Sequence, residues 1–312
     1  MCDGGGSKTE FLLFDKAGHV LAFARGEGAN ANFLPPEKAA ANVCGGIQAC
    51  LQNAGLTVGQ LSGVWLFIPG FKSCLQTVRE FLGGVTVQLT GDEKNAFYAA
   101  LGAPVGIAVL AGTGSFATGH GRSGRRAVAG GWGPLFSDEG SGYHIGALCL
   151  AKLAWLHDRQ LHGTRLEQLV LAALDAPDVL SLRRLAYEPG FDRKKVAGLC
   201  QIVAQAAREG DPHAHEILDT AAMALANLAG TVADTLEETD LPVALTGGVA
   251  RMGELFEEKF RAALAVRLPC CRWQRACCEP VVGGALCLLS ETAGVSLADG
   301  TVSQNLLKGK NG

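Results

Sequence analysis

Three glycine-rich segments contain the kinds of residue that hold phosphate groups. They are DGGGSKTE at residues 3–10, LAGTGSFATG at 110–119 and ALTGGVA at 244–250. Glycine has no Cβ, so a glycine loop lets backbone N–H groups approach a phosphate closely. The first segment is not a P-loop, because Ser7 precedes Lys8 and no glycine stands upstream at the required distance. The remaining interpretations of its glycines are a flexible terminal tail or a backbone loop that contacts a phosphate.

Two aspartates lie where a carboxylate could take part in phosphoryl transfer. Transfer to an alcohol needs positioning, charge neutralisation and a group that accepts the hydroxyl proton. Asp92 follows a predicted strand and precedes a predicted helix, and Asp138 lies in GGWGPLFSDEGSGYHIG at residues 130–146. Each aspartate could instead cap a helix, since Asp is a favoured capping residue and a helix is expected to start near Glu139.

The first two glycine segments lie in the same arrangement of predicted strands. Residues 11–14 and 20–24 are predicted strands joined by a turn at 15–18. A strand at 105–110 leads into the second segment, and a short strand, a turn and another strand follow it. This repetition indicates a duplicated unit. Two such hairpins, facing each other across a cleft, would suit a polyphosphate held between two domains.

The rest of the chain alternates between strand and helix signals, which favours α/β layers with a largely parallel sheet. The region between Asp138 and Glu238 is mainly helical by the same criteria, with an apolar stripe over 217–236. Other predicted elements are a helix started by Pro35-Pro36-Glu37 and ended by Gly55, strands at 64–68, 85–89 and 243–245, and helices at 73–81, after Asp92, from about Met252 and at 283–289.

Composition excludes several classes of function. The chain has 312 residues and a net charge of −3, so it has no electrostatic footprint for nucleic acid or an anionic membrane. No apolar stretch reaches membrane-spanning length, and we expect no signal peptide before the first motif. The eleven cysteines are expected to be reduced thiols in the cytoplasm. The cluster Cys270, Cys271, Cys277 and Cys278 lacks zinc-site spacing, so we expect no structural metal there.

The motifs DGGGSKTE, LAGTGSFATG, GGWGPLFSDEGSGYHIG and ALTGGVA, in this order, resemble the N-acetylglucosamine kinase branch of the sugar kinase/heat-shock chaperone/actin superfamily. Activator ATPases of benzoyl-CoA reductase-type systems share this sequence family. The resemblance covers nearly the whole chain. It implies an α/β fold of two ribonuclease H-like lobes with ATP in the cleft between them. The N-terminal lobe would span 1–106, the C-terminal lobe 107–292, and a segment at 293–312 would pack back on the N-terminal lobe.

The resemblance also implies roles for individual residues. Asp3 would hold Mg²⁺ through water, and Asp92 would be the catalytic base. The sugar would contact Asn32, Thr113, Gly131 and Asp138. The phosphate-1 motif would comprise Gly4, Gly5, Gly6, Ser7, Lys8 and Thr9, the phosphate-2 motif Gly112, Thr113, Gly114 and Ser115, and the adenosine motif Thr246, Gly247 and Gly248.

Some positions depart from the family pattern. TGDEKNAF replaces an Asn-Asp-Ala-type motif, which makes Glu93 a second candidate base, and FSDEG replaces Gly-Asp-Glu-Gly. Asn30 is an alternative to Asn32 as the sugar contact. Trp132 is expected to pack in the core and His144 to have a structural role.

The function implied by the resemblance is ATP-dependent phosphorylation of the 6-hydroxyl of N-acetylglucosamine. Two alternatives are a glucosamine kinase and an activator ATPase of a redox enzyme. Activators of that kind bridge a cluster between subunits by cysteines in glycine-rich contexts, which this sequence does not clearly have. The relatives imply a homodimer whose partners are an amino sugar and ATP, with no nucleic acid and no membrane.

Overall fold

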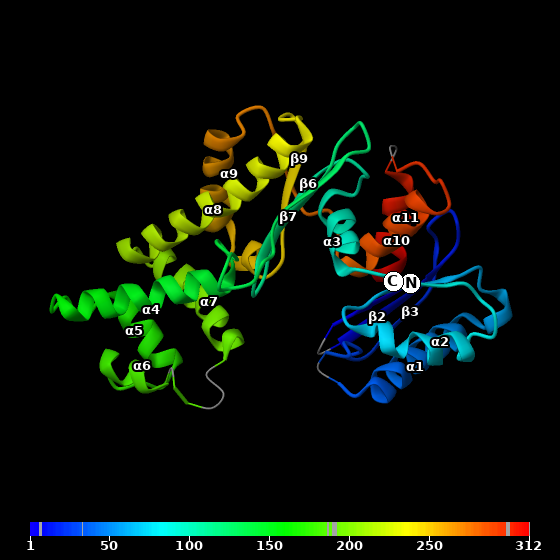
Figure 1. Cartoon of the computed structure of the whole chain (residues 1–312), viewed down its shortest axis with the longest axis horizontal. Coiled ribbons are helices and arrows are strands. Elements are labelled where there is room, and N and C mark those ends of the chain that lie inside the picture. Colours follow the sequence, from blue (N-terminus) through cyan, green and yellow to red (C-terminus); the bar gives the residue numbers. More distant parts are fainter. Residues whose placement is uncertain (6–7, 33, 186, 189–191, 298–299, 312) are drawn as a thin grey trace. The chain divides into compact units, whose positions relative to one another are not determined.

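A computed structural model of the chain describes residues 1–5, 8–32, 34–185, 187–188, 192–297 and 300–311 (Figure 1). The chain divides into two compact units: the first unit comprises 1–104 and 276–312, and the second comprises 105–275. The division differs from the expected lobes mainly at residues 276–292, which join the first unit. The reason is that the helix within this stretch packs against a helix of the first unit.

The first unit is built on a five-stranded sheet in the order β3-β2-β1-β4-β5. Strands β1, β2 and β3 form an antiparallel meander, whereas β4 and β5 run parallel to β1. The phosphate-1 motif joins β1 to β2, and the predicted turn at 15–18 joins β2 to β3. The strands are β1 Cys2–Gly4, β2 Lys8–Phe14, β3 Val20–Glu27, β4 Val64–Phe67 and β5 Val87–Thr90.

Helices cover both faces of this sheet (Figure 1). On one face, α1 (Pro36–Ala54) and α2 (Leu75–Phe81) enclose a core that includes Phe11 and Leu66. Gly55 ends α1 in a left-handed conformation, as predicted. The other face carries α3 (Asp92–Leu101), α10 (Pro280–Glu291) and α11 (Thr301–Asn311), and two short 3₁₀ helices span Val58–Gln60 and Phe71–Cys74.

The second unit repeats the topology of the first. Its sheet has the order β10-β9-β6-β7-β8, again with a three-stranded antiparallel meander followed by two parallel strands. The duplication expected from the two glycine segments is therefore confirmed. The expectation of a largely parallel sheet is wrong, because each meander makes its sheet mixed. The strands are β6 Gly106–Ala111, β7 Ser115–His120, β8 Arg126–Gly130, β9 Pro242–Thr246 and β10 Arg272–Arg275.

Most of the second unit between its meander and β9 is helical, as predicted. The long helix α8 (Pro212–Leu236) buries the predicted apolar stripe against the sheet. In the described part of the chain, no helix combines the length and the apolar character needed to cross a membrane. The other helices are α4 Gly142–Asp158, α5 Arg165–Ala173, α6 Val179–Leu185, α7 Arg193–Arg208, a 3₁₀ helix Val249–Met252 and α9 Glu254–Arg267.

The four clustered cysteines are divided between the two units. Cys270 and Cys271 belong to the second unit, and Cys277 and Cys278 belong to the first. Burial raises the pKa of the Cys278 thiol to about 12, so it stays protonated at neutral pH. Within the described residues, no three His, Cys, Asp or Glu side chains gather in a group that could hold a metal ion.

Candidate active site

In the first unit, three parallel strands bring distant residues to one edge of the sheet. Asp3 of β1 pairs with Phe67 of β4, and Phe67 in turn pairs with Thr90 of β5. Gly91 and Asp92 follow Thr90 directly, so Asp3 and Asp92 both come from the carboxyl ends of parallel strands. In open α/β sheets this edge is where ligands bind.

Asp3 is held by a residue that the sequence analysis missed. The side-chain amide of Asn95, on α3, donates a hydrogen bond to Oδ1 of Asp3 over 2.6 Å. Asn95 is only 1% exposed, and its Oδ1 is buried with no hydrogen-bond partner among the described residues. An unsatisfied buried oxygen next to a carboxylate is compatible with a hydrated cation. The only signal in the sequence is that Asn95 lies three residues after Asp92.

Helix α3 begins at Asp92, and Gly91 occupies the capping position without a side-chain capping bond. Asp92 is therefore the first residue of the helix and does not occupy its capping position. The side chain of Asp92 lies outside the described structure, so its role as a base stays a prediction. Glu93 is exposed, and its carboxylate folds back over Gly91, where an added methyl group would overlap with it. This carboxylate lies at the positive end of the α3 dipole.

The ends of the phosphate-1 loop are fixed by backbone contacts. A methyl group added at Gly4 would lie 2.8 Å from Cγ1 of Ile68, so glycine permits the close approach of β1 to the end of β4. The N–H of Gly5 donates to the carbonyl of Lys8 over 2.9 Å, and the Gly5 carbonyl accepts the N–H of Ala29. The loop is thus an ordered hairpin at these positions, not a flexible tail. Gly6 and Ser7 lie outside the described residues.

Lys8 is engaged by a carboxylate. Its Nζ lies 3.0 Å from Oε1 of Glu10, and Nη2 of Arg25 lies 2.6 Å from the same oxygen. Burial would raise the pKa of Glu10, but the hydrogen bonds from Arg25 and Lys8 outweigh it and lower the pKa below its ordinary value. Thr9, which lies between Lys8 and Glu10 in the sequence, is fully buried, and its Oγ1 has no hydrogen-bond partner in the described structure. Lys8 nevertheless keeps more than half of its side chain exposed.

The two candidate asparagines have different surroundings. Asn30 is buried, and its Oδ1 accepts the N–H of Asn32 over 2.9 Å. Asn30 thus shapes a local turn. Asn32 is exposed, and its side chain lies against Gly70, where an added methyl group would be 2.5 Å from Oδ1. Asn32 is therefore the one that presents its amide beside the end of β4.

In the second unit, the phosphate-2 and adenosine motifs meet. Strands β6 and β9 are parallel, with Leu110 paired to Thr246, so the loops that follow them start side by side. Gly247 has a φ of 100°, and a methyl group there would overlap with the carbonyl of Ala111. Only glycine combines this backbone conformation with such a close approach. The two glycine segments, far apart in sequence, therefore form one surface at the strand ends.

Asp138 is bonded to the phosphate-2 loop and does not cap a helix. It is 3% exposed, and its Oδ1 accepts the backbone N–H of Ser115 over 3.0 Å. The Ser115 hydroxyl donates to the carbonyl of Glu139 over 2.7 Å. Helix α4 begins at Gly142 and is capped by Ser141, so the expected helix start near Glu139 and the capping role of Asp138 are wrong.

Two further sugar-contact candidates are Thr113, within this loop, and Gly131, beside it. Thr113 and Gly131 are exposed, and the N–H of Gly131 donates to the carbonyl of Ser115 over 3.0 Å. The second oxygen of Asp138 forms an ion pair with Arg193, at the start of α7. The sequence analysis missed Arg193, because no local pattern connects it to a residue 55 positions earlier.

His144 has the expected structural role. Its Nδ1 accepts the N–H of Gly140 over 3.0 Å, and burial lowers the pKa of its imidazole. A neutral ring is required for this contact, because a protonated Nδ1 cannot accept a hydrogen bond. Trp132 differs from expectation: it is 78% exposed and does not pack in the core.

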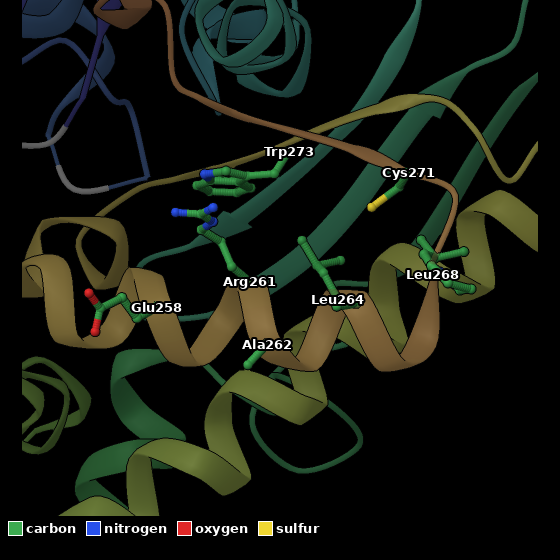
Figure 2. Close-up of a pocket in the computed structure, with 9 residues that line it drawn as sticks. Glu258, Arg261, Ala262, Leu264, Leu268, Cys271 and Trp273 are labelled. Atoms are coloured by element: carbon green, nitrogen blue, oxygen red, sulfur yellow. The ribbon is translucent and has the colours of Figure 1, made fainter.

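A separate surface pocket of about 430 Å³ lies between α9 and β10 of the second unit (Figure 2). Leu264 and Leu268 supply apolar walls, and the Arg261 guanidinium points toward the Trp273 ring. None of its lining residues belongs to a glycine motif, so this pocket is not the predicted nucleotide site.

Two units with the strand order 3-2-1-4-5, each with a glycine loop in its first hairpin, define a pair of ribonuclease H-like domains, the fold of the actin-like ATPases and sugar kinases. The chain belongs to the BadF/BadG/BcrA/BcrD ATPase family, whose model matches residues 2–268. The expected fold class and family are both confirmed.

Similar proteins extend over most of the chain. The N-acetylmuramic acid/N-acetylglucosamine kinase of Clostridium acetobutylicum is 29% identical over 275 residues, which are 86% of this chain and 90% of that protein. The N-acetyl-D-glucosamine kinase of Dictyostelium discoideum is 28% identical over 307 residues, which are 92% of this chain and 96% of that protein. A crystal structure from Chromobacterium violaceum, provisionally named an N-acetylglucosamine kinase, has a TM-score of 0.68 and 27% identity. The match covers 92% of this chain and 97% of that protein.

Proposed function

We propose that this protein is an ATP-dependent sugar kinase that phosphorylates N-acetylglucosamine at its 6-hydroxyl. The observation that carries the proposal is the hydrogen bond from the Ser115 N–H to the buried carboxylate of Asp138. It joins a candidate sugar ligand directly to a candidate phosphate loop, which is what transfer between a nucleotide and a sugar requires. The sugar kinases similar over most of the chain support the same substrate class.

The residues at the first-unit strand ends fit a magnesium ion. Asp3 offers a carboxylate, Asn95 has an unsatisfied buried oxygen, and Mg²⁺ prefers oxygen ligands and retained waters. Bound Mg²⁺ would neutralise charge on the phosphates of ATP. In this proposal Asp3 holds the ion through water, and Asn95 keeps the Asp3 carboxylate in one orientation.

The chain's own groups then perform the remaining tasks. Backbone N–H groups of the phosphate-1 motif (residues 4–9) and the phosphate-2 motif (residues 112–115) bind the phosphates of ATP, and Thr246, Gly247 and Gly248 lie by the adenosine. Asn32, Thr113, Gly131 and Asp138 hold the sugar. Asp92 accepts the proton of the attacking hydroxyl as the bond to phosphorus forms.

An ADP-release assay tests the proposal. It compares N-acetylglucosamine, glucosamine, N-acetylmuramic acid, N-acetylmannosamine, glucose and no sugar, with mass analysis of the product. We expect N-acetylglucosamine to raise ADP release well above the rate without sugar. ATP binding without stimulation by any amino sugar would contradict the kinase function. Iron content and ultraviolet-visible absorption would then test the activator ATPase.

We also propose that the chain acts in the cytoplasm as a homodimer, which is what the family resemblance of its motifs implies. Light scattering coupled to gel filtration measures the oligomeric state. A mass near 32.4 kDa would be that of a monomer and would contradict the dimer.

A further inference from the structure

Arg193 forms an ion pair with Asp138, a carboxylate that is bonded to the phosphate-2 loop. We propose that Arg193 is a positioning residue, which fixes Asp138 and, through it, the loop Gly112–Ser115 in the arrangement that binds the sugar. The part of this inference that concerns the sugar rests on the proposed function. The part that concerns the loop rests on geometry within the second unit alone.

Both oxygens of Asp138 are engaged, in two different directions. Oδ1 accepts the N–H of Ser115, and Oδ2 contacts Nη2 of Arg193. The carboxylate is 4% exposed, and burying a charge is costly unless a partner of opposite charge lies beside it. The backbone of Asp138 also has a φ of 73°, which is uncommon for residues other than glycine. Arg193 supplies the only charge in the described structure that pairs with this carboxylate.

The phosphate-2 loop lies directly against this ion pair. A methyl group added at Gly114 would lie 2.8 Å from Oδ1 of Asp138 and 3.0 Å from Nη2 of Arg193. A change in the position of either side chain therefore alters the space occupied by the loop. The guanidinium also lies over the ring of Tyr143, 5.7 Å from its centroid, which restricts its orientation.

The helix that carries Arg193 is itself fixed to the helix that follows Asp138. Helix α7 begins at Arg193 and is capped by Asp192, whose carboxylate accepts two backbone N–H groups of its first turn. Next along α7, Val196 packs its carbonyl on Gly146 of α4, where an added methyl group would overlap with it. The close packing of α4 on α7 leaves the start of α7 little freedom to move. Arg193 thus reaches Asp138 from a rigid element.

The experiment compares Arg193→Ala and Arg193→Lys with the control Lys195→Ala, which removes an exposed positive charge from the same turn of α7. We measure sugar KM and kcat at saturating ATP, and the hydrogen exchange rate of the Ser115 amide without any ligand. Arg193→Ala should raise the sugar KM roughly 10-fold or more with a smaller change in kcat, and should speed exchange at Ser115 by a similar factor. Arg193→Lys keeps the charge without the planar fork, so it should recover part of both effects.

Two outcomes overturn the inference. One is an Arg193→Ala protein that folds and matches Lys195→Ala in sugar KM and in Ser115 exchange. The other, available even if Arg193→Ala does not fold, is an Arg193→Gln protein, which lacks the charge but keeps a long polar side chain, with the Ser115 exchange rate and sugar KM of the unchanged chain. If the unchanged chain shows no sugar-dependent ADP release, the proposed function fails, whereas the exchange rate still decides whether Arg193 orders the loop.

Discussion

The side-chain amide of Asn95 donates a hydrogen bond to the carboxylate of Asp3, a residue 92 positions earlier in the chain. Helix α3, which carries Asn95, begins at Asp92. The candidate magnesium ligand and the candidate base are therefore connected through one helix. Gly283 of α10 packs against the backbone of Asn95, where an added methyl group would overlap with its carbonyl, and this contact holds α3 in place.

Replacing Asn95 with Ala should weaken magnesium-dependent ATP binding. The change removes a hydrogen bond to a charged group, which is worth about 1.5–3 kcal/mol, and takes away one contact that orients the Asp3 carboxylate. We expect roughly a 10-fold higher Mg²⁺ concentration for half-maximal ATP binding, measured by calorimetry without sugar. Asn53→Ala, which removes an exposed amide on α1, is the control. Equal magnesium titrations for the two variants would mean that Asn95 does not orient Asp3.

The structure changes what is expected of Asp138→Ala. Loss of the sugar contact alone would raise the sugar KM roughly 10-fold or more and leave ATP binding intact. However, Asp138 also accepts the Ser115 N–H, so removing the whole carboxylate should weaken ATP binding as well. Asp138→Asn keeps an oxygen that can accept this N–H and should retain more of the ATP affinity. The measurement is the ATP affinity of Asp138→Ala and of Asp138→Asn, determined by direct binding. Equal affinities would show that the Ser115 contact has no effect on nucleotide binding.

The repeated hairpins were predictable because their signals are local: alternating apolar strands, turn residues and glycines within about 30 residues. The mixed character of the sheets was missed, since β1 has only three residues and gives little strand signal, although it opens the antiparallel meander that makes the sheet mixed. Long-range contacts such as Asp138–Arg193 carry no sequence signature either. The exposure of Trp132 was missed because its residue type favours burial, whereas its loop presents it outward.

Helix α11 should contribute to the stability of the first unit, although the sequence did not indicate a helix there. Leu306 is fully buried, and Asn305 donates from its side chain to the carbonyl of Ala17 over 3.0 Å. Leu306→Ala should lower the free energy of unfolding by about 2–5 kcal/mol, through lost burial and a residual cavity. Urea denaturation measures this against Gln304→Ala, an exposed position on the same helix. If Leu306→Ala lowers the free energy of unfolding no more than Gln304→Ala does, the packing of α11 does not stabilise the first unit.

The His144 contact predicts how stability depends on pH. Burial lowers the pKa of His144 in the folded protein, below the value of about 6.5 for an unfolded chain. As pH falls, the unfolded state therefore takes up the proton first. The stabilisation is complete above about pH 6.5 and is lost as the pH falls through the lower pKa of the folded state. His144→Gln should show a flatter decline of unfolding free energy between pH 8 and pH 5. The same slope in both proteins would assign the pH dependence to other groups.

The last prediction concerns Asp92, the first residue of α3. Gly91 holds the capping position, so Asp92→Asn does not remove a cap, and Asn is close to Asp in size. An amide cannot accept the proton of the sugar hydroxyl, and general-base catalysis is typically worth about 10²–10⁴-fold. We therefore expect kcat to fall by roughly 10²–10⁴-fold, with ATP affinity and melting temperature nearly unchanged. Glu93→Gln is the matched control, because it removes the neighbouring carboxylate that lies over Gly91. Near-normal kcat in Asp92→Asn together with a large loss in Glu93→Gln would assign the base to Glu93.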